Sequence, residues 1–341
     1  MDAHPPLNPT ARLCILGSGS RGNCSVLHVT CPRGDGSFAE SVCLIDLGFS
    51  PRSTAHLLES VGLSLDRVTA VLLTHLDTDH CHTGWNLFCP LADDPLLRSP
   101  LPRSACLFMH ESHLERAYAR GVNGGRIQRF AATRTAPGPA FTACSAAGEA
   151  HAVTVHPLMS FHDDLGSAAF RIHVGGGCWP DGPVLGFATD LGRITDELVA
   201  HFSHDPLRDA PGIDVLVIES NYCPKMQLAS DRPDFLKRRV MGGRGHLSND
   251  EALDAIEAIA PRSHVVLVHL SGQCNDPALV ASLHRRRRGT ACMGPDCLTI
   301  SAQDAPTPWV PIRRPPSRAA PGPAPVIRPL ERSGRQLSLF G

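Results

Sequence analysis

Five short apolar segments of this chain end in an acidic residue or a histidine. The segments are 42–46, 68–75, 184–190, 213–219 and 265–269, and their last residues are Asp46, His75, Asp190, Glu219 and His269. Short apolar runs of this kind predict buried β-strands. Polar groups that gather where strands end form the rim of an active site in layered folds. The chain must therefore fold so that these strand ends meet at one edge.

Helix-like segments lie between the predicted strands and carry apolar residues at three- and four-residue spacing. They are residues 51–62, 111–120, 196–202, 248–260 and 276–286. This order predicts a layered α/β protein whose folded domain spans residues 1–302. From residue 303 proline and arginine dominate and the periodicity disappears, so we expect a disordered tail over 303–341.

Charge and hydropathy narrow the classes of protein that this chain can represent. No segment approaches the roughly 18 uninterrupted apolar residues of a membrane span, and the first residues lack the layout of a signal peptide. We expect a cytoplasmic protein without membrane contacts. The net charge is −1, so any binding of nucleic acid must come from local basic patches.

The heptad at residues 74–80, where the predicted strand 68–75 ends, predicts a metal site. It places His75, Asp77, Asp79 and His80 within six residues. Imidazole and carboxylate together are ligands for divalent metals. A solvated polar loop would explain the heptad alone. The metal site is favoured because His162, Asp190 and His269 also lie at or just beyond strands.

The order of these residues resembles that of the metallo-β-lactamase fold, an αββα sandwich of two mixed sheets packed face to face with helices outside. Five segments resemble, more narrowly, its YycJ/WalJ-type subfamily: residues 16–27, 187–192, 219–222, 243–252 and 268–277. The resemblance makes residues 1–302 a metallo-β-lactamase-like catalytic domain. Members of that subfamily are regarded as DNA exonucleases, and the layout also resembles ribonuclease Z.

The resemblance implies two divalent metal ions at this cluster. His75, Asp77 and His162 would hold one ion, Asp79, His80 and His269 would hold the second, and Asp190 would bridge them. Asp46 would lie behind the cluster and fix a ligand histidine. The alternative for Asp46 is a carboxylate that only caps the turn after its strand.

One position departs from the usual pattern, which has a histidine where this chain has Asp77. A carboxylate is a harder and anionic ligand, so it shifts preference from zinc toward manganese or iron. The expected cofactors are therefore manganese, zinc or iron, with Asp77 favouring manganese or iron.

The resemblance also suggests how a phosphodiester would be hydrolysed by metal-activated water. Asp79 would orient the water, and His246 is the candidate general acid because imidazole titrates near neutral pH. Arg244, Ser248 and Asn249 would contact the substrate phosphate, since they lie at a predicted helix N-terminus. The alternative for His246 is a structural role before that helix.

We expect a metal-dependent hydrolase, a DNA exonuclease of replication or repair, with RNA left open as a substrate. A small-ester or thioester hydrolase of the same fold is one alternative. The other is a catalytically inactive DNA-repair scaffold. The sequence leaves the polarity of cleavage and the oligomeric state open.

The last residues resemble a docking peptide. Gln336, Leu337, Ser338, Leu339 and Phe340 are similar to the short motif by which bacterial polymerases and repair enzymes bind the β sliding clamp. Apolar anchors on an unstructured tail can enter a partner's groove and keep the enzyme near DNA. We therefore expect the clamp as a partner and association with the nucleoid. The alternative is that these residues fold back onto the domain.

Overall fold

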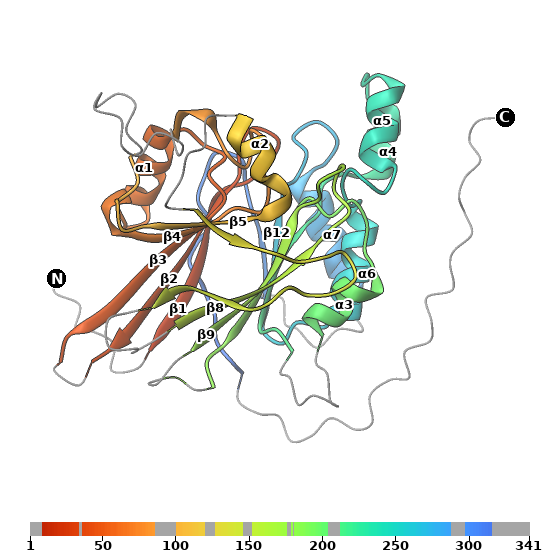
Figure 1. The fold of residues 1–341 in the computed structure, drawn as a ribbon. Helices are drawn as coiled ribbons and strands as arrows, with labels where there is room; N and C mark the ends of the chain where they lie inside the picture. Colours follow the sequence, from red (N-terminus) through yellow and green to blue (C-terminus); the bar gives the residue numbers. More distant parts are fainter. Residues whose placement is uncertain are drawn as a thin grey trace.

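The computed structural model describes residues 9–33, 36–85, 100–119, 127–145, 152–175, 179, 181–203, 212–287 and 297–315. The strands in these ranges form two sheets of seven strands each (Figure 1). The order in the first sheet is β14-β1-β2-β3-β4-β5-β6. Its strands are β1 (Thr10–Gly17), β2 (Cys24–Pro32), β3 (Phe38–Ile45), β4 (Val68–Leu72), β5 (Cys106–His110), β6 (Ile127–Phe130) and β14 (Val310–Pro311).

The second sheet has the order β13-β12-β11-β10-β9-β8-β7. Its strands are β7 (Phe141–Ser145), β8 (Ala152–Met159), β9 (Ala168–Gly175), β10 (Val184–Ala188), β11 (Val215–Glu219), β12 (His264–Val268) and β13 (Leu298–Ile300). Both sheets are mixed. Strands β3 to β6 and β10 to β13 run parallel within their sheets, whereas the remaining neighbours are antiparallel.

An apolar core lies between the two sheets. Ile45 and Leu72 from the first sheet and Phe170 and Val217 from the second belong to one cluster of buried side chains. Strands that alternate their side chains between two faces can bury one face here and the other beneath helices. The predicted sandwich of two mixed sheets with helices outside is therefore confirmed.

Helices cover the outer faces of both sheets (Figure 1). On the first sheet these are α1 (Pro51–Ser60) and α2 (Leu114–Ala119), and on the second α3 (Asp196–Phe202), α6 (Asn249–Ile259) and α7 (Pro277–Arg287). Two further helices, α4 (Pro224–Ala229) and α5 (Asp234–Met241), project beside the second sheet. Short 3-10 turns occupy Leu65–Arg67, Thr83–Trp85 and Glu111–His113. None of the described helices has the length and apolar character needed to cross a bilayer.

Helix α6 begins where the sequence predicts a helix start. The Ser248 side chain accepts a hydrogen bond from the Glu251 backbone N–H, and the Glu251 side chain accepts one from the Ser248 N–H. This reciprocal capping box satisfies two backbone donors that the helix itself leaves unpaired. It fixes the point at which the preceding loop, residues 242–247, joins the helix.

The expected boundary at residue 302 is wrong as far as the described residues extend, because residues 303–315 pack on the domain. Arg12 and Leu13 of β1 pair with Pro311 and Val310. Val310 and Ile312 are buried in the core between the sheets. These apolar side chains match a free edge beside β1, and that gain outweighs the local proline content. Residues 316–341, including the predicted docking peptide, lie outside the described residues.

Candidate metal centre

Two candidate ligands, Asp190 and His269, and the nearby Asp46 adopt an unusual backbone conformation at strand ends. Asp46 follows β3, Asp190 lies beyond β10 and His269 follows β12, with φ values of 63°, 54° and 58°. Side chains other than glycine rarely adopt the left-handed region, and such strain collects at functional sites. Because these strands are parallel within their sheets, their carboxyl ends meet at the same edge.

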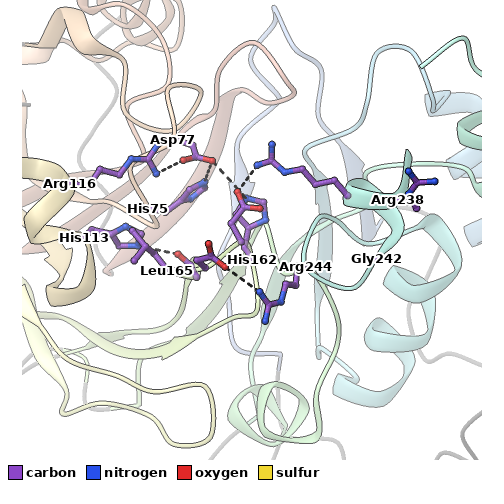
Figure 2. A pocket seen from close by; sticks show the side chains of 13 residues that line it. His75, Asp77, His113, Arg116, His162, Leu165, Arg238, Gly242 and Arg244 are labelled. Atoms are coloured by element: carbon purple, nitrogen blue, oxygen red, sulfur yellow. Dashed lines mark hydrogen bonds and ion pairs between the residues drawn. The ribbon is translucent and has the colours of Figure 1, made fainter. Parts of the chain in front are cut away.

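The first predicted triad comes together at this edge. The Oδ2 atom of Asp77 lies 3.8 Å from His75 Nε2 and 3.9 Å from His162 Nε2. One ligand atom from each of the three residues lies within 4.8 Å of the others. Figure 2 shows the side chains of His75 and Asp77, from one loop, and of His162, from another, pointing toward one another.

The second predicted triad lies beside the first. Asp79 Oδ2 is 3.4 Å from His269 Nε2 and 3.6 Å from His80 Nε2. Asp190 approaches both triads, with Oδ2 3.0 Å from His80 Nε2 and Oδ1 3.9 Å from His162 Nε2. The folded chain therefore collects all seven predicted ligands in the predicted groups of three, with Asp190 between them.

Polar groups behind the centre contact Nδ1 of each histidine and turn Nε2 inward. Asp46 Oδ2 lies 2.7 Å from Nδ1 of His80, in the position expected for a partner that fixes a ligand histidine. The other contacts are Thr74 Oγ1 to His75 at 3.0 Å, the Gly245 carbonyl to His162 at 2.9 Å, and the Asn221 amide to His269 at 3.0 Å. Such outer contacts set ring orientation and raise the affinity of a metal site.

Gly245 is needed for one of these contacts. Its carbonyl oxygen reaches His162, and a Cβ atom at this position would overlap the carbonyl oxygen of Arg239. A side chain would force the loop away from α5 and from His162. The glycine in the 243–249 segment thus serves the centre through close backbone packing.

The residues at this edge fit divalent metal ions. His75 Nε2 is buried and has no hydrogen-bond partner. Burial, reinforced by nearby His80, lowers the pKa of His75 well below its ordinary value, so its lone pair is available at neutral pH. Although burial alone would raise the pKa of Asp190, His269 and His80 hold it well below the usual range. Unprotonated imidazole and ionised carboxylate are the states that bind a cation.

His80 and His269 carry the complementary charge. Burial alone would lower the pKa of His80, but Asp190 and Asp46 hold it well above its ordinary value. Burial likewise opposes protonation of His269, and Asp190 and Asp79 raise its pKa. Protonated rings neutralise the buried carboxylates in the protein alone, and a bound cation would take over that role while the protons are released.

His246, the predicted general acid, lies at the centre with a partner that sequence reasoning missed. His246 Nδ1 is 3.0 Å from Glu219 Oε2 and 3.3 Å from Asp190 Oδ1. Glu219 is fully buried, and its Oε1 accepts hydrogen bonds from the backbone of Leu191 and Leu247. The sequence marked Glu219 only as an acid at a strand end. Its pairing with a histidine 27 residues later depends on the fold.

A cleft of about 640 Å³ opens over the first triad. Arg116 projects from one side, and Arg238 and Arg244 from the other (Figure 2), and Arg239 also lines the cleft. A smaller hollow of about 400 Å³ reaches Asp79, Asp190 and His246. His75, Asp77 and His162 line both spaces, so the cleft leads directly to the candidate ligands.

Of the three predicted phosphate contacts, only Arg244 lines the cleft, where it pairs with Asp164 at 3.2 Å. The Ser248 hydroxyl is used in the capping box of α6. The Asn249 side chain is buried and bonds to Ser220 and Asn275. The expectation that Ser248 and Asn249 reach a phosphate is therefore wrong, because the helix start and the core use both side chains.

The sandwich and its His/Asp centre at the shared sheet edge define a metallo-hydrolase. The chain belongs to the family described as the Beta-lactamase superfamily domain, whose sequence model matches residues 43–270. This family has the metallo-β-lactamase fold and its centre implies divalent metal ions.

Individual relatives agree with this assignment. The chain is 24% identical over 265 residues to the exodeoxyribonuclease YycJ of Bacillus anthracis, covering 75% of this chain and 81% of that protein. The crystal structure of Zn²⁺-bound PqqB from Methylobacterium extorquens matches with a TM-score of 0.50 and 15% identity, over 87% of this chain and 99% of that one. The long form of RNase Z from yeast matches with a TM-score of 0.53 and 11% identity, over 88% of this chain and 42% of that one. The two structures show the shared fold.

Proposed function

We propose that this protein is a metal-dependent phosphodiesterase that acts as a DNA exonuclease in replication or repair. The observation that carries the proposal is the position of Asp190, which contacts both triads beneath an arginine-lined cleft. Two adjacent cation sites of this kind suit the attacking and leaving oxygens of a phosphodiester.

The charges of the cleft support an anionic substrate. Its lining contains four arginines and three aspartates, Asp77, Asp163 and Asp164. Divalent cations at the base would add to this positive charge. A neutral small ester or thioester gains little from such a lining, whereas a phosphodiester is attracted to it.

Helix α5 adds a surface suited to a nucleic-acid strand. Arg238 and Arg239 line the cleft, and Phe235 lies one helical turn before them with 67% of its surface exposed. An aromatic side chain beside cations can stack on an unpaired base while the cations contact phosphates. We expect a strand end to approach the centre along this helix.

Different groups at the centre would carry out different parts of phosphodiester hydrolysis. Bound divalent cations would supply Lewis acidity to the phosphate oxygens and make a nearby water more acidic. Asp79 would orient the attacking water. Glu219 and Asp190 would hold the His246 ring through Nδ1, leaving Nε2 on the other side of the ring to act as general acid toward the departing oxygen.

Recruitment by the β sliding clamp is the second part of the proposal. The motif at residues 336–340 and the proline-rich segment before it support a tethered docking peptide.

The 24% identity with an exodeoxyribonuclease supports DNA as the substrate. Zinc is compatible because the structurally similar PqqB was determined bound to Zn²⁺, whereas Asp77 favours manganese or iron.

A direct assay separates the possible activities. The full-length protein is stripped of metal and reloaded with manganese or zinc. It is then given end-labelled single- and double-stranded DNA, matched RNA, a p-nitrophenyl phosphodiester and a thioester. We expect stepwise release of nucleotides from DNA ends.

Asp190→Asn, which removes the carboxylate shared by both triads, is the negative control for this assay. Thioester hydrolysis without DNA cleavage would contradict the proposal and favour a small-ester hydrolase. DNA or clamp binding without hydrolysis of any substrate would favour a scaffold.

A further inference from the structure

Within the described ranges, Asp77 is the candidate ligand whose second oxygen is held by an arginine. Arg116 Nη1 donates to Asp77 Oδ1 at 2.6 Å, while Asp77 Oδ2 faces the two histidines of its triad (Figure 2). The Asp77 side chain is 27% exposed, so it is not locked in place by burial alone. The ion pair therefore leaves one oxygen of Asp77 facing the centre.

Helix α2 holds Arg116 in position. Ala117 is fully buried in the apolar cluster between the first sheet and the helices that cover it. His113, just before the helix, is also buried. The His113 Nε2 atom lies 3.1 Å from the carbonyl of Gly166, which also lines the cleft, so the start of α2 is tied to the loop that follows His162. Arg116 thus reaches Asp77 from a fixed element and not from a loop.

The Arg116 contact does for Asp77 what Thr74 and the Gly245 carbonyl do for the histidines of the same triad. Those contacts engage Nδ1 of His75 and His162 and leave Nε2 for the centre. Arg116 engages Oδ1 and leaves Oδ2. Each of the three residues then offers a single atom.

The net charge of the Asp77–Arg116 pair also bears on the candidate metal site. Asp77 and Arg116 together carry no net charge, as one neutral imidazole does. The pair can therefore occupy the position of a neutral ligand without adding a third uncompensated negative charge to Asp79 and Asp190. It does so with an oxygen donor in place of a nitrogen donor.

We propose that Arg116 is a positioning residue that restricts Asp77 to binding a divalent cation through one oxygen, so that the Asp77–Arg116 pair replaces a neutral histidine. Without Arg116, the carboxylate can rotate and bind through both oxygens, which raises the coordination number. Zinc favours four ligands, whereas manganese accepts six. Arg116 therefore keeps the site open to zinc, and its loss shifts selectivity toward manganese.

The test measures the ratio of the zinc and manganese dissociation constants by competition with a fluorescent chelator. Both ions carry two charges, so the change in electrostatic attraction after removal of an arginine largely cancels in this ratio. Arg116→Met keeps the length of the side chain and removes its donors. We expect the ratio to move toward manganese by about tenfold, the lower end of the usual effect of such partners.

A matched control lies across the cleft. Arg244 pairs with Asp164 at 3.2 Å, and Asp164 is 95% exposed and belongs to neither triad. Arg244→Met should leave the ratio unchanged. In the Asp77→His background, Arg116→Met should also have no effect on the ratio, because the residue it positions is gone.

Three results would overturn the proposal. They are an unchanged ratio in Arg116→Met, an equal shift in Arg244→Met, and an equal shift in the Asp77→His background. Melting of the metal-free variants checks that α2 remains folded, and Arg116→Gln, which retains one donor group, should show a smaller shift than Arg116→Met. The readout is metal affinity, so the outcome does not depend on which bond the enzyme hydrolyses.

Discussion

At the scale of single residues, the centre depends on side chains that are not candidate ligands. Asp46 holds His80, Asn221 holds His269, and Glu219 holds His246. Each contact engages the Nδ1 atom of the ring and so fixes the orientation of the ring at the centre. These partners are as important to the geometry as the ligands themselves.

Asp79 has two roles in the proposed mechanism, as a ligand and as the group that orients water. Asp79→Asn keeps the shape of the side chain but removes its charge. We expect the rate of DNA hydrolysis at saturating metal to fall by about a hundredfold or more, with the fold intact by circular dichroism. Turnover close to that of the wild type would show that Asp79 does not have this role.

His246→Ala separates a general acid from a metal ligand. We expect slow cleavage of DNA with both metals retained, measured by mass spectrometry of the metal content. A p-nitrophenyl phosphodiester should be affected less, since its leaving group needs no proton. Loss of metal would instead make His246 a ligand, because it also lies within 4.8 Å of Asp190, Glu219 and His269.

At the scale of elements, short helices and loops hold the side chains of the centre in position. The capping box of α6 fixes the loop that carries His246, and α2 carries Arg116. Strand β14 shows that a segment rich in proline can still complete a sheet when its apolar residues match a free edge. Proline is tolerated there because an edge strand need not donate every backbone hydrogen bond.

Two truncations test the role of β14. A chain that ends at residue 315 should melt close to the full-length protein. A chain that ends at residue 302 loses Val310 and Ile312, which are almost completely buried. We expect its free energy of unfolding to be lower by about 3 kcal/mol or more, measured by urea denaturation. Equal stability of the two truncations would show that β14 contributes little.

At the scale of the whole molecule, two sheets bring the ends of parallel strands to one edge. The candidate ligands come from both sheets, so bound metals would link the two halves of the sandwich. The native state would then be stabilised by metal binding, because the unfolded chain does not hold these groups together.

Removal of metal should therefore lower the melting temperature. With free metal at about 100 times the dissociation constant, each site contributes about 2.7 kcal/mol. We expect chelation to lower the melting temperature by several degrees, measured by differential scanning calorimetry. The Asp190→Asn variant should respond less to the chelator. Identical melting with and without metal would argue against a bound cation in the folded protein.

The docking peptide can be tested apart from the catalytic centre. Fluorescence anisotropy of the last twelve residues against the β clamp should show binding. Full-length protein lacking residues 336–341 should lose clamp affinity and keep its activity on short free DNA. Unchanged clamp affinity after this truncation, or loss of the fold, would contradict the proposed role of the tail.

The sequence by itself determined the fold class, and its resemblance to a known family named the seven candidate ligands that the structure brings together. Strand-end polarity is a local pattern, and a hydrophobic strand that ends in Asp or His carries that information within a few residues. The compact heptad at residues 74–80 does the same. Asp46 was named as a partner through the same resemblance, and the structure places it against His80 and not only at the turn after its strand.

Only the tertiary structure decided the contacts between distant segments. Glu219 and His246 are 27 residues apart, and Arg116 and Asp77 are 39 apart, so no local pattern joins them. Local pattern also suggested phosphate contacts for Ser248 and Asn249, but the helix cap and the core use their side chains. Likewise, the composition of residues 303–315 predicts disorder, while the free edge of β1 makes an ordered strand more stable. In each case, the decisive partner lies elsewhere in the chain, and only folding brings it into contact.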